Sequence, residues 1–179
     1  MVVKKQEKID VIQQGIREKE MCRCYFSYDL SYFYCYPNAV NDKFILAQEE
    51  DEFILNGYFI RKISHLTRVE IRMDGCNAIN HMIGTADHVI HPGIDISNWQ
   101  SIFEGLSQMD TFVIIEDQIG GKFAIGAIKK VLKNKLYFKK FNAKGIWDEN
   151  DLEIPYSKIT GVEWGTRYDI QWKKYLEQR

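Results

Sequence analysis

The sequence predicts a mostly β protein with short helices, built from two tandem units that each fold one helix and five strands into a small β-barrel. Three observations support this class. Phe, Trp and Tyr make up 13% of the 179 residues, and aromatic side chains favour the half-buried surface of strands. Short apolar segments are separated by turn residues, as in sheets of short strands. The pattern of a helix followed by strands also occurs twice, which indicates a repeat.

The repeat is visible in three pairs of segments that keep their order along the chain. The first pair has apolar residues at i, i+3 and i+7, the spacing of an amphipathic helix. The other two pairs lie in predicted strands. The paired segments are 9–16 with 99–106, 42–45 with 134–137, and 66–71 with 159–164, at offsets of 90, 92 and 93 residues. Because these offsets are nearly constant, we expect two copies of one unit.

The first unit is expected over residues 1–75, with a helix that ends near Glu20. Its predicted strands are 22–29, 32–40, 43–49, 53–60 and 66–72. Residues 49–52 carry four adjacent carboxylates, which would repel one another if buried, so they predict a solvated hairpin tip. Residues 76–95 are expected to form a connector with a short helical turn.

The second unit is expected over residues 96–179. Ser97 and Gln100 predict a capping box at the start of its helix. Its predicted strands are 111–117, 121–132, 135–142, 150–155 and 159–164. In the C-terminal tail, aromatic and apolar residues would share one side of an extended segment, and packing on the barrel or on a partner chain explains this stripe. These tail residues are Trp164, Tyr168, Ile170, Trp172 and Tyr175.

The four cysteines have neither zinc-ribbon nor redox spacing. Cys22 and Cys24 face the same side of a strand. Together with Cys35 and Cys76, they are predicted to be reduced thiols that pack as small apolar side chains.

The layout resembles the Sm-like (Lsm) small β-barrel. The first unit carries Gly57, Ile60 and Ile63 at three-residue spacing, followed by the segment 67–71. In the second unit, segments 141–147 and 154–160 resemble uncharacterised bacterial members of this superfold. The resemblance implies two Sm-like, or SH3-like, barrels in tandem. The Asp-x-x-x-Asn and Arg-Gly patterns with which Sm rings contact RNA are not intact here, so no RNA-contact residue is carried over.

A basic hairpin is the main candidate for binding an anionic ligand. Lysines attract phosphates, and an exposed aromatic ring can stack on a base. The alternative is a solvated face whose lysines protect a strand edge. The candidate nucleic-acid-binding residues are Lys129, Lys130, Lys133, Lys135, Tyr137, Lys139 and Lys140.

The connector holds the side chains Cys76, His81, His88 and His91. Their types suit zinc, but their spacing matches no familiar closed site, and polar loop histidines are the alternative. No nucleophile elbow or phosphate-binding glycine loop occurs. We therefore assign no catalytic residue, metal or cofactor, and a metal-dependent activity at the connector stays the alternative to a non-enzymatic protein.

Charge and hydropathy limit the partners. Residues 111–179 carry 13 Lys and Arg against 9 Asp and Glu, whereas residues 1–110 carry 11 against 16. No apolar leader follows Met1, and no run approaches the roughly 20 apolar residues of a membrane span. We expect a cytoplasmic, non-enzymatic binding or scaffold module that contacts protein partners or further copies through barrel edges and surfaces, without a membrane. The alternative is RNA or single-stranded nucleic-acid binding through the basic hairpin 129–144.

Overall fold

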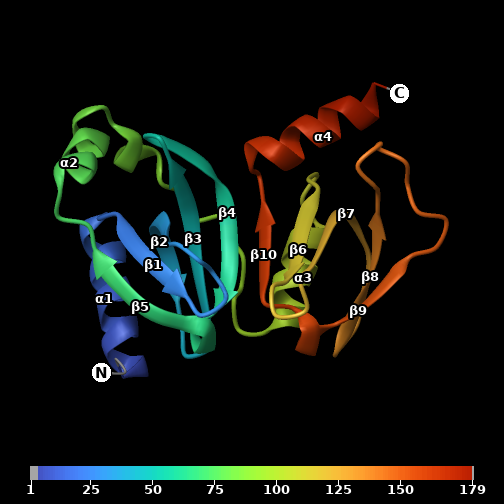
Figure 1. Ribbon diagram of the computed structural model, residues 1–179, viewed down its shortest axis with the longest axis horizontal. Coiled ribbons are helices and arrows are strands. Elements are labelled where there is room, and N and C mark those ends of the chain that lie inside the picture. The colour runs from blue at the N-terminus through green and yellow to red at the C-terminus, as the bar shows by residue number, and fades with distance from the viewer. Residues whose placement is uncertain (1–3, 179) are drawn as a thin grey trace. The chain divides into compact units, whose positions relative to one another are not determined.

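The computed structural model describes residues 4–178 and consists mainly of antiparallel strands with short helices (Figure 1). The mostly β class is therefore confirmed. The chain divides into two compact units, Met1–Pro92 (unit 1) and Gly93–Arg179 (unit 2). Residues 1–3 and 179, which the expected units include, lie outside the described range.

Unit 1 is a sheet of five strands with a helix packed on one face. Within it the strands follow the order β5-β1-β2-β3-β4, and every pairing is antiparallel. The predicted strands are confirmed to within three residues at their ends. The elements are α1 (Lys5–Glu18), β1 (Cys22–Phe26), β2 (Phe33–Val40), β3 (Phe44–Asp51), β4 (Ile54–Lys62), the 3-10 helix η1 (Ile63–His65), β5 (Leu66–Ile71), α2 (Gly75–Met82) and the 3-10 helix η2 (Thr85–His88).

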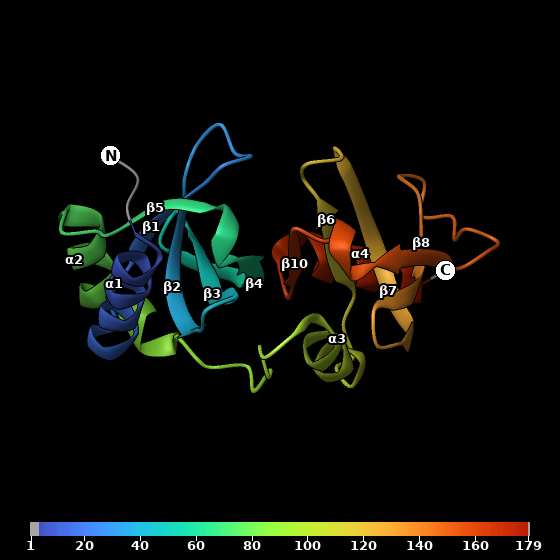
Figure 2. The ribbon, with the colours of Figure 1, turned by 90° about the horizontal axis from the view of Figure 1, so that it is seen from below.

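The core of unit 1 lies between the sheet and α1, and Figure 2 shows this helix beside β2. Alternate residues Cys22, Cys24 and Phe26 of β1 are buried beside Ile12 of the helix. A Cβ atom on Gly15 would lie 2.8 Å from the Cys22 sulfur, so this glycine lets the helix approach the sheet closely. The helix then ends at Lys19, whose left-handed backbone turns the chain into β1.

Unit 2 has a corresponding strand order, β10-β6-β7-β8-β9, again with antiparallel pairings. Residues Ile102, Phe103 and Leu106 of its first helix are buried, and the Phe103 ring stacks on Tyr156 with centroids 5.7 Å apart. The elements are α3 (Trp99–Ser107), β6 (Val113–Asp117), β7 (Lys122–Val131), β8 (Lys135–Lys140), β9 (Leu152–Pro155), the 3-10 helix η3 (Tyr156–Lys158), β10 (Gly161–Trp164) and α4 (Arg167–Glu177).

The cap of α3 differs from the prediction by one residue. Asn98, not Ser97, is the N-cap, and its side-chain oxygen accepts a hydrogen bond from the Ser101 amide at 3.1 Å. Ser97 is instead bonded to Asp95. Asn and Ser are comparable as caps, so the choice between neighbours depends on where the chain turns.

Each unit has the same succession of helix, four strands, a 3-10 helix, a fifth strand beside the first, and a second helix. The second helix of unit 1, α2, lies in the segment that we expected to be a connector. The second helix of unit 2, α4, occupies the tail that we considered as an extended segment. That extended interpretation is wrong. A capping box in which the Asp169 carboxylate accepts from the Thr166 amide begins a helix there instead.

The hairpin tip 49–52 is a further correction. Glu50 is only 7% exposed, so the tip is not fully solvated. Its carboxylate accepts hydrogen bonds from the Phe53 amide at 2.7 Å and from the Asn80 side chain at 3.2 Å. These donors offset the cost of removing the charge from water.

The four cysteines are not joined by disulfides in the structure, and their reduced state in solution stays a prediction. Cys22, Cys24 and Cys35 are buried and Cys76 is partly exposed. Burial raises the pKa of the Cys22 thiol, and the neighbouring Cys24 thiol and burial raise that of Cys35. Within residues 4–178 no helix has both the length and the apolar character that a membrane crossing requires.

Candidate functional site

The structure places the basic hairpin on β7, β8 and the turn between them. Lys129 and Lys130 lie near the end of β7, Lys133 lies in the turn, and the remaining candidates lie on β8. All are exposed or half-buried. The hairpin itself is therefore formed as the sequence predicts, with Leu136 and Phe138 of β8 facing the core.

The polar side chains of β8 form ion pairs and hydrogen bonds with residues of segment 148–153. Glu153 accepts from the Lys135 ammonium at 2.9 Å and from the Tyr137 hydroxyl at 3.0 Å. The ammonium of Lys140 lies 3.4 Å from Asp148. Lys139 donates to the Glu149 carbonyl and lies 3.9 Å from Asp151. These contacts offset much of the positive charge of β8. Within residues 4–178, the three lysines Lys129, Lys130 and Lys133 have no acidic partner at ion-pair distance.

The Cys and His residues of segment 76–95, which we expected to be a connector, are spread over α2, η2 and the residues that follow η2. Cys76 and His81 lie on α2, His88 ends η2, and His91 follows. His81 contacts Glu20 at 3.3 Å. In the part of the chain that the structure describes, no three His, Cys, Asp or Glu side chains are grouped so that they could hold a metal ion.

A second polar surface, which we did not anticipate, lies on the outer face of unit 1. We call it the Arg–Tyr face, and it comprises Arg23, Tyr25, Tyr32, Tyr34, Arg68, Glu70 and Arg72. Its origin is strand alternation. Cys22 and Cys24 point into the core, so Arg23 and Tyr25 point outward. Arg23 pairs with Tyr34 of β2 on one side and with Glu70 of β5 on the other.

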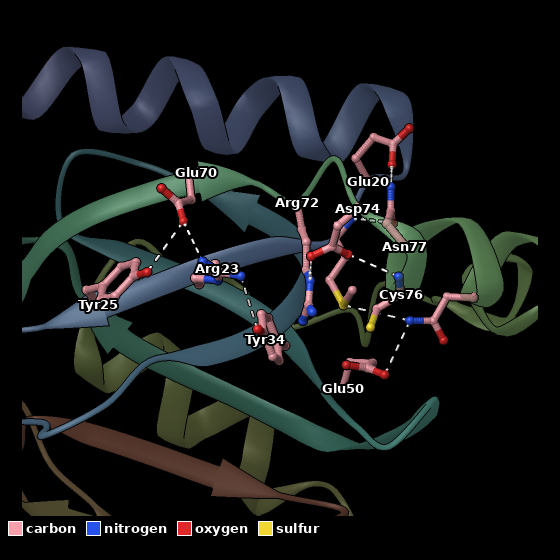
Figure 3. A network of polar contacts seen from close by, with 12 residues as sticks. Glu20, Arg23, Tyr25, Tyr34, Glu50, Glu70, Arg72, Asp74, Cys76 and Asn77 are labelled. Carbon is pink, nitrogen blue, oxygen red and sulfur yellow. Dashed lines mark hydrogen bonds and ion pairs between the residues drawn. The ribbon is translucent and has the colours of Figure 1, made fainter.

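Arg23 is the centre of this face (Figure 3). Its guanidinium donates to the Glu70 carboxylate at 3.1 Å and to the Tyr34 hydroxyl at 3.2 Å. It also lies 4.8 Å from the centroid of the Tyr32 ring. This geometry combines an ion pair with a cation–π contact and fixes the planar side chain.

The other two arginines repeat the arrangement at the borders of the face. The guanidinium of Arg72 lies 3.8 Å from the Tyr34 ring centroid and is paired with Asp74. The guanidinium of Arg68 lies 5.0 Å from the Tyr25 ring centroid and is paired with Glu70. Each tyrosine of the face thus has an arginine beside its ring.

Exposure and charge decide what this face can contact. Tyr32 is 41% exposed, and the side chain of Arg68 is 59% exposed. Burial raises the pKa of Tyr34, so this phenol keeps its proton at neutral pH. The face presents aromatic rings and guanidinium groups on the surface of the sheet.

A sequence signal for the Arg–Tyr face did exist. Alternate residues 23 and 25, 32 and 34, and 68, 70 and 72 are all Arg, Tyr or Glu. Each short run predicts one outward face of a strand. What the sequence does not contain is the strand order that brings the three runs side by side.

Comparison with protein-family models, with curated proteins and with solved structures finds no significant match to this chain.

Proposed function

We propose that this chain is a non-enzymatic binding protein made of two Sm-like barrels in tandem. The shared succession of elements supports this architecture, since in both units a fifth strand returns beside the first after a 3-10 helix. An experimental structure in which β4 and β5 approach each other across η1, and β9 and β10 across η3, so that each sheet closes, would support it. Two flat sheets would contradict it.

The binding surface that we propose is the Arg–Tyr face, and its ligand is a partner protein. The observation that carries this proposal is the stacking of Arg23, Arg68 and Arg72 on the rings of three tyrosines. Tyr and Arg are enriched among the residues that dominate binding energy at protein interfaces. Since these side chains are already held by one another, they lose little conformational freedom when a partner binds.

Charge favours a protein over a nucleic acid as the ligand of this face. Its three arginines stand beside Glu70 and Asp74, which offset two of the three positive charges. The basic hairpin is the rival surface, and nucleic acid is its ligand. Only Lys129, Lys130 and Lys133 remain available to attract a nucleic acid to this hairpin, because the lysines of β8 contact acidic residues.

Site-specific crosslinking tests the proposal in the native cell. Tyr32 is replaced by a photo-activatable benzoylphenylalanine, the cells are irradiated, and the adducts are identified by mass spectrometry with and without nuclease treatment. We expect a discrete protein adduct that nuclease does not remove. A nuclease-sensitive adduct would show that nucleic acid mediates the contact at this face and would contradict a protein ligand, and the absence of any adduct would refute the proposed surface.

A matched pair of charge reversals provides the control. Arg68→Glu changes the most exposed guanidinium of the Arg–Tyr face, and it should reduce the adduct about fivefold or more, the effect of losing roughly 1 kcal/mol. Lys174→Glu makes the same change at an exposed residue of α4, and it should leave the yield unchanged. Equal yields in both variants would show that the arginines do not contribute.

A further inference from the structure

The loop between β1 and β2, residues 27–32, stands out from the sheet of unit 1, as Figure 2 shows. Within this loop Leu30 has a relative exposure of 108%, so its side chain is completely accessible to water. Single exposed apolar residues are common on protein surfaces and need no explanation by themselves. This leucine differs from them because the chain is fixed on both sides of it, and because one of the fixed residues belongs to the Arg–Tyr face.

On one side of Leu30, the loop is fixed to the core of unit 1. The Asp29 carboxylate lies 3.0 Å from the guanidinium of Arg61, whose side chain is only 2% exposed. The preceding residue, Tyr28, stacks on the ring of Phe26 with centroids 5.8 Å apart and planes at 10°. These contacts hold the chain up to the residue directly before the leucine.

On the other side of Leu30, the loop is fixed to the Arg–Tyr face. The centroid of the Tyr32 ring lies 5.6 Å from that of Tyr25 and 4.9 Å from that of Tyr34. The guanidinium of Arg23 lies 4.8 Å from the Tyr32 centroid. Because both flanks are held, the leucine is presented in a restricted position, and little conformational freedom is lost when another molecule covers it.

The size of the apolar contribution decides which kind of surface can cover this side chain. Burial of one leucine side chain strengthens binding about tenfold to a hundredfold. In a pocket of a partner protein, this gain adds to the contacts of the surrounding face and is typical of a hot spot. On a lipid bilayer it is insufficient, since even a myristoyl chain, with many more methylene groups, gives only marginal membrane binding.

The charge of unit 1 also disfavours a membrane or a nucleic acid as the cover. Residues 1–92 carry 11 Lys and Arg against 13 Asp and Glu, and the arginines of the Arg–Tyr face are paired with Glu70 and Asp74. Cell membranes and nucleic acids present negative charge, so they need a basic surface for attraction. A protein is therefore the ligand that fits this loop.

We propose that Leu30 anchors the partner protein of the Arg–Tyr face by inserting into an apolar pocket of that partner. The tyrosine rings beside Tyr32 then contact the border of the pocket and exclude water from it, as the surroundings of a hot spot do. This inference rests on the proposed function, because the pocket belongs to the protein that binds the Arg–Tyr face. It adds the residue that dominates the affinity and the chemistry of the surface that receives it.

Affinity measurements with the full chain test the anchor. The protein that the Tyr32 crosslink identifies is purified and titrated by calorimetry. Leu30→Ser should weaken binding about tenfold or more, because the apolar side chain is lost. Leu30→Met keeps an apolar side chain of similar volume and should bind within about threefold of the wild type. Since the side chain is exposed, neither substitution should shift the urea unfolding midpoint.

The matched control is Ile119→Ser, which removes an apolar side chain that is 72% exposed in the turn between β6 and β7 of unit 2. It should leave the affinity unchanged. If Leu30→Ser binds the purified partner as tightly as the wild type, or if both serine variants weaken binding equally, the anchor is refuted while the Arg–Tyr face stands. If no adduct forms at Tyr32, the proposed function and the anchor fail together.

Vesicles test the lipid bilayer as the alternative cover. The full chain is sedimented with vesicles of phosphatidylcholine that contain about one-fifth phosphatidylserine. We expect the protein to stay in the supernatant. Sedimentation with the vesicles that Leu30→Ser abolishes would overturn the proposal in favour of a membrane surface.

Discussion

Gly126 faces the carbonyl oxygen of Lys139 so closely that a Cβ atom on this glycine would lie 1.9 Å from that oxygen. At this residue β7 pairs with Val113 of β6 on one edge and with Lys140 of β8 on the other. The two ladders that β7 forms, with β6 and with β8, therefore meet at a position where only glycine allows the backbones to approach so closely.

Gly126→Ala should lower the free energy of unfolding by about 3 kcal/mol or more, because the added methyl group must push two strands apart. Urea unfolding followed by circular dichroism measures the change. Gly75→Ala is the matched control, since a Cβ there meets no atom within 4 Å. It should be neutral or stabilise α2 by up to about 1 kcal/mol. A Gly126→Ala protein as stable as the wild type would show that the strands tolerate separation.

A buried ion pair of unit 1 gives a second stability prediction. The side chain of Arg61 is 2% exposed and its guanidinium lies 3.0 Å from the Asp29 carboxylate. The guanidinium also lies 4.2 Å from the centroid of the Phe33 ring. Asp29→Ala removes the carboxylate charge facing a buried cation and should destabilise the protein by about 3 kcal/mol. The double variant Asp29→Ala/Arg61→Met should recover most of this loss in thermal or urea unfolding. If the double variant is no more stable than Asp29→Ala, the effect comes from lost packing and not from the charge.

The four thiols should react in two classes. Cys22, Cys24 and Cys35 are fully buried, and the pKa values of Cys22 and Cys35 are raised. Since the thiolate is the reactive form, they should remain unmodified in the folded protein. Ellman's reagent should titrate one thiol, Cys76, in native buffer and all four in denaturant. As a control, the Cys76→Ser variant should show no reaction in native buffer. Rapid reaction of two or more thiols of the wild type in native buffer would contradict the burial of the other three.

His65 should make stability depend on pH. Burial, together with the charge of Lys62, lowers its pKa below the ordinary value of 6.5, and its ring packs against Tyr28. The unfolded chain therefore takes up a proton at a higher pH than the folded chain does. The stabilisation is complete above about pH 6.5 and decreases as the pH falls toward the lower pKa of the folded state.

The measurement is the unfolding free energy of the wild type minus that of His65→Gln, at several pH values between about 5 and 8. We expect this difference to decrease as the pH falls. The subtraction removes every pH-dependent contribution to stability that the two proteins share. A difference that is constant with pH would show that His65 has the same pKa in both states.

Most strands were predictable from the sequence because their signals are local. Alternation along each segment and turn residues between the segments define these strands. The helix α4 was missed although its signal was present. Thr166 and Asp169 have the spacing of a capping box. Residues 164, 168, 170 and 172 also fit one side of an extended segment, so the two local signals compete and the cap prevails in the structure.

The side-chain environments were less predictable because they depend on contacts between distant residues. Glu50 is buried because Asn80, thirty residues later, donates to it. The charge of β8 is offset by acids that arrive only when β9 pairs with it. In the same way, the Arg–Tyr face requires β1 to lie between β2 and β5. The residue types suggested binding, but the sheet order decides which of them meet.

The unequal burial of the cysteines has a practical consequence for the study of this protein. Cys76 begins α2 next to Asp74, whose partner Arg72 stacks on Tyr34 of the Arg–Tyr face (Figure 3). A thiol-reactive dye attached there would sit close to that surface while the other three sulfurs stay shielded. Cys76 of the wild-type protein is therefore a natural labelling site for a fluorophore. The fluorescence of this label can report the binding of a partner without any mutagenesis.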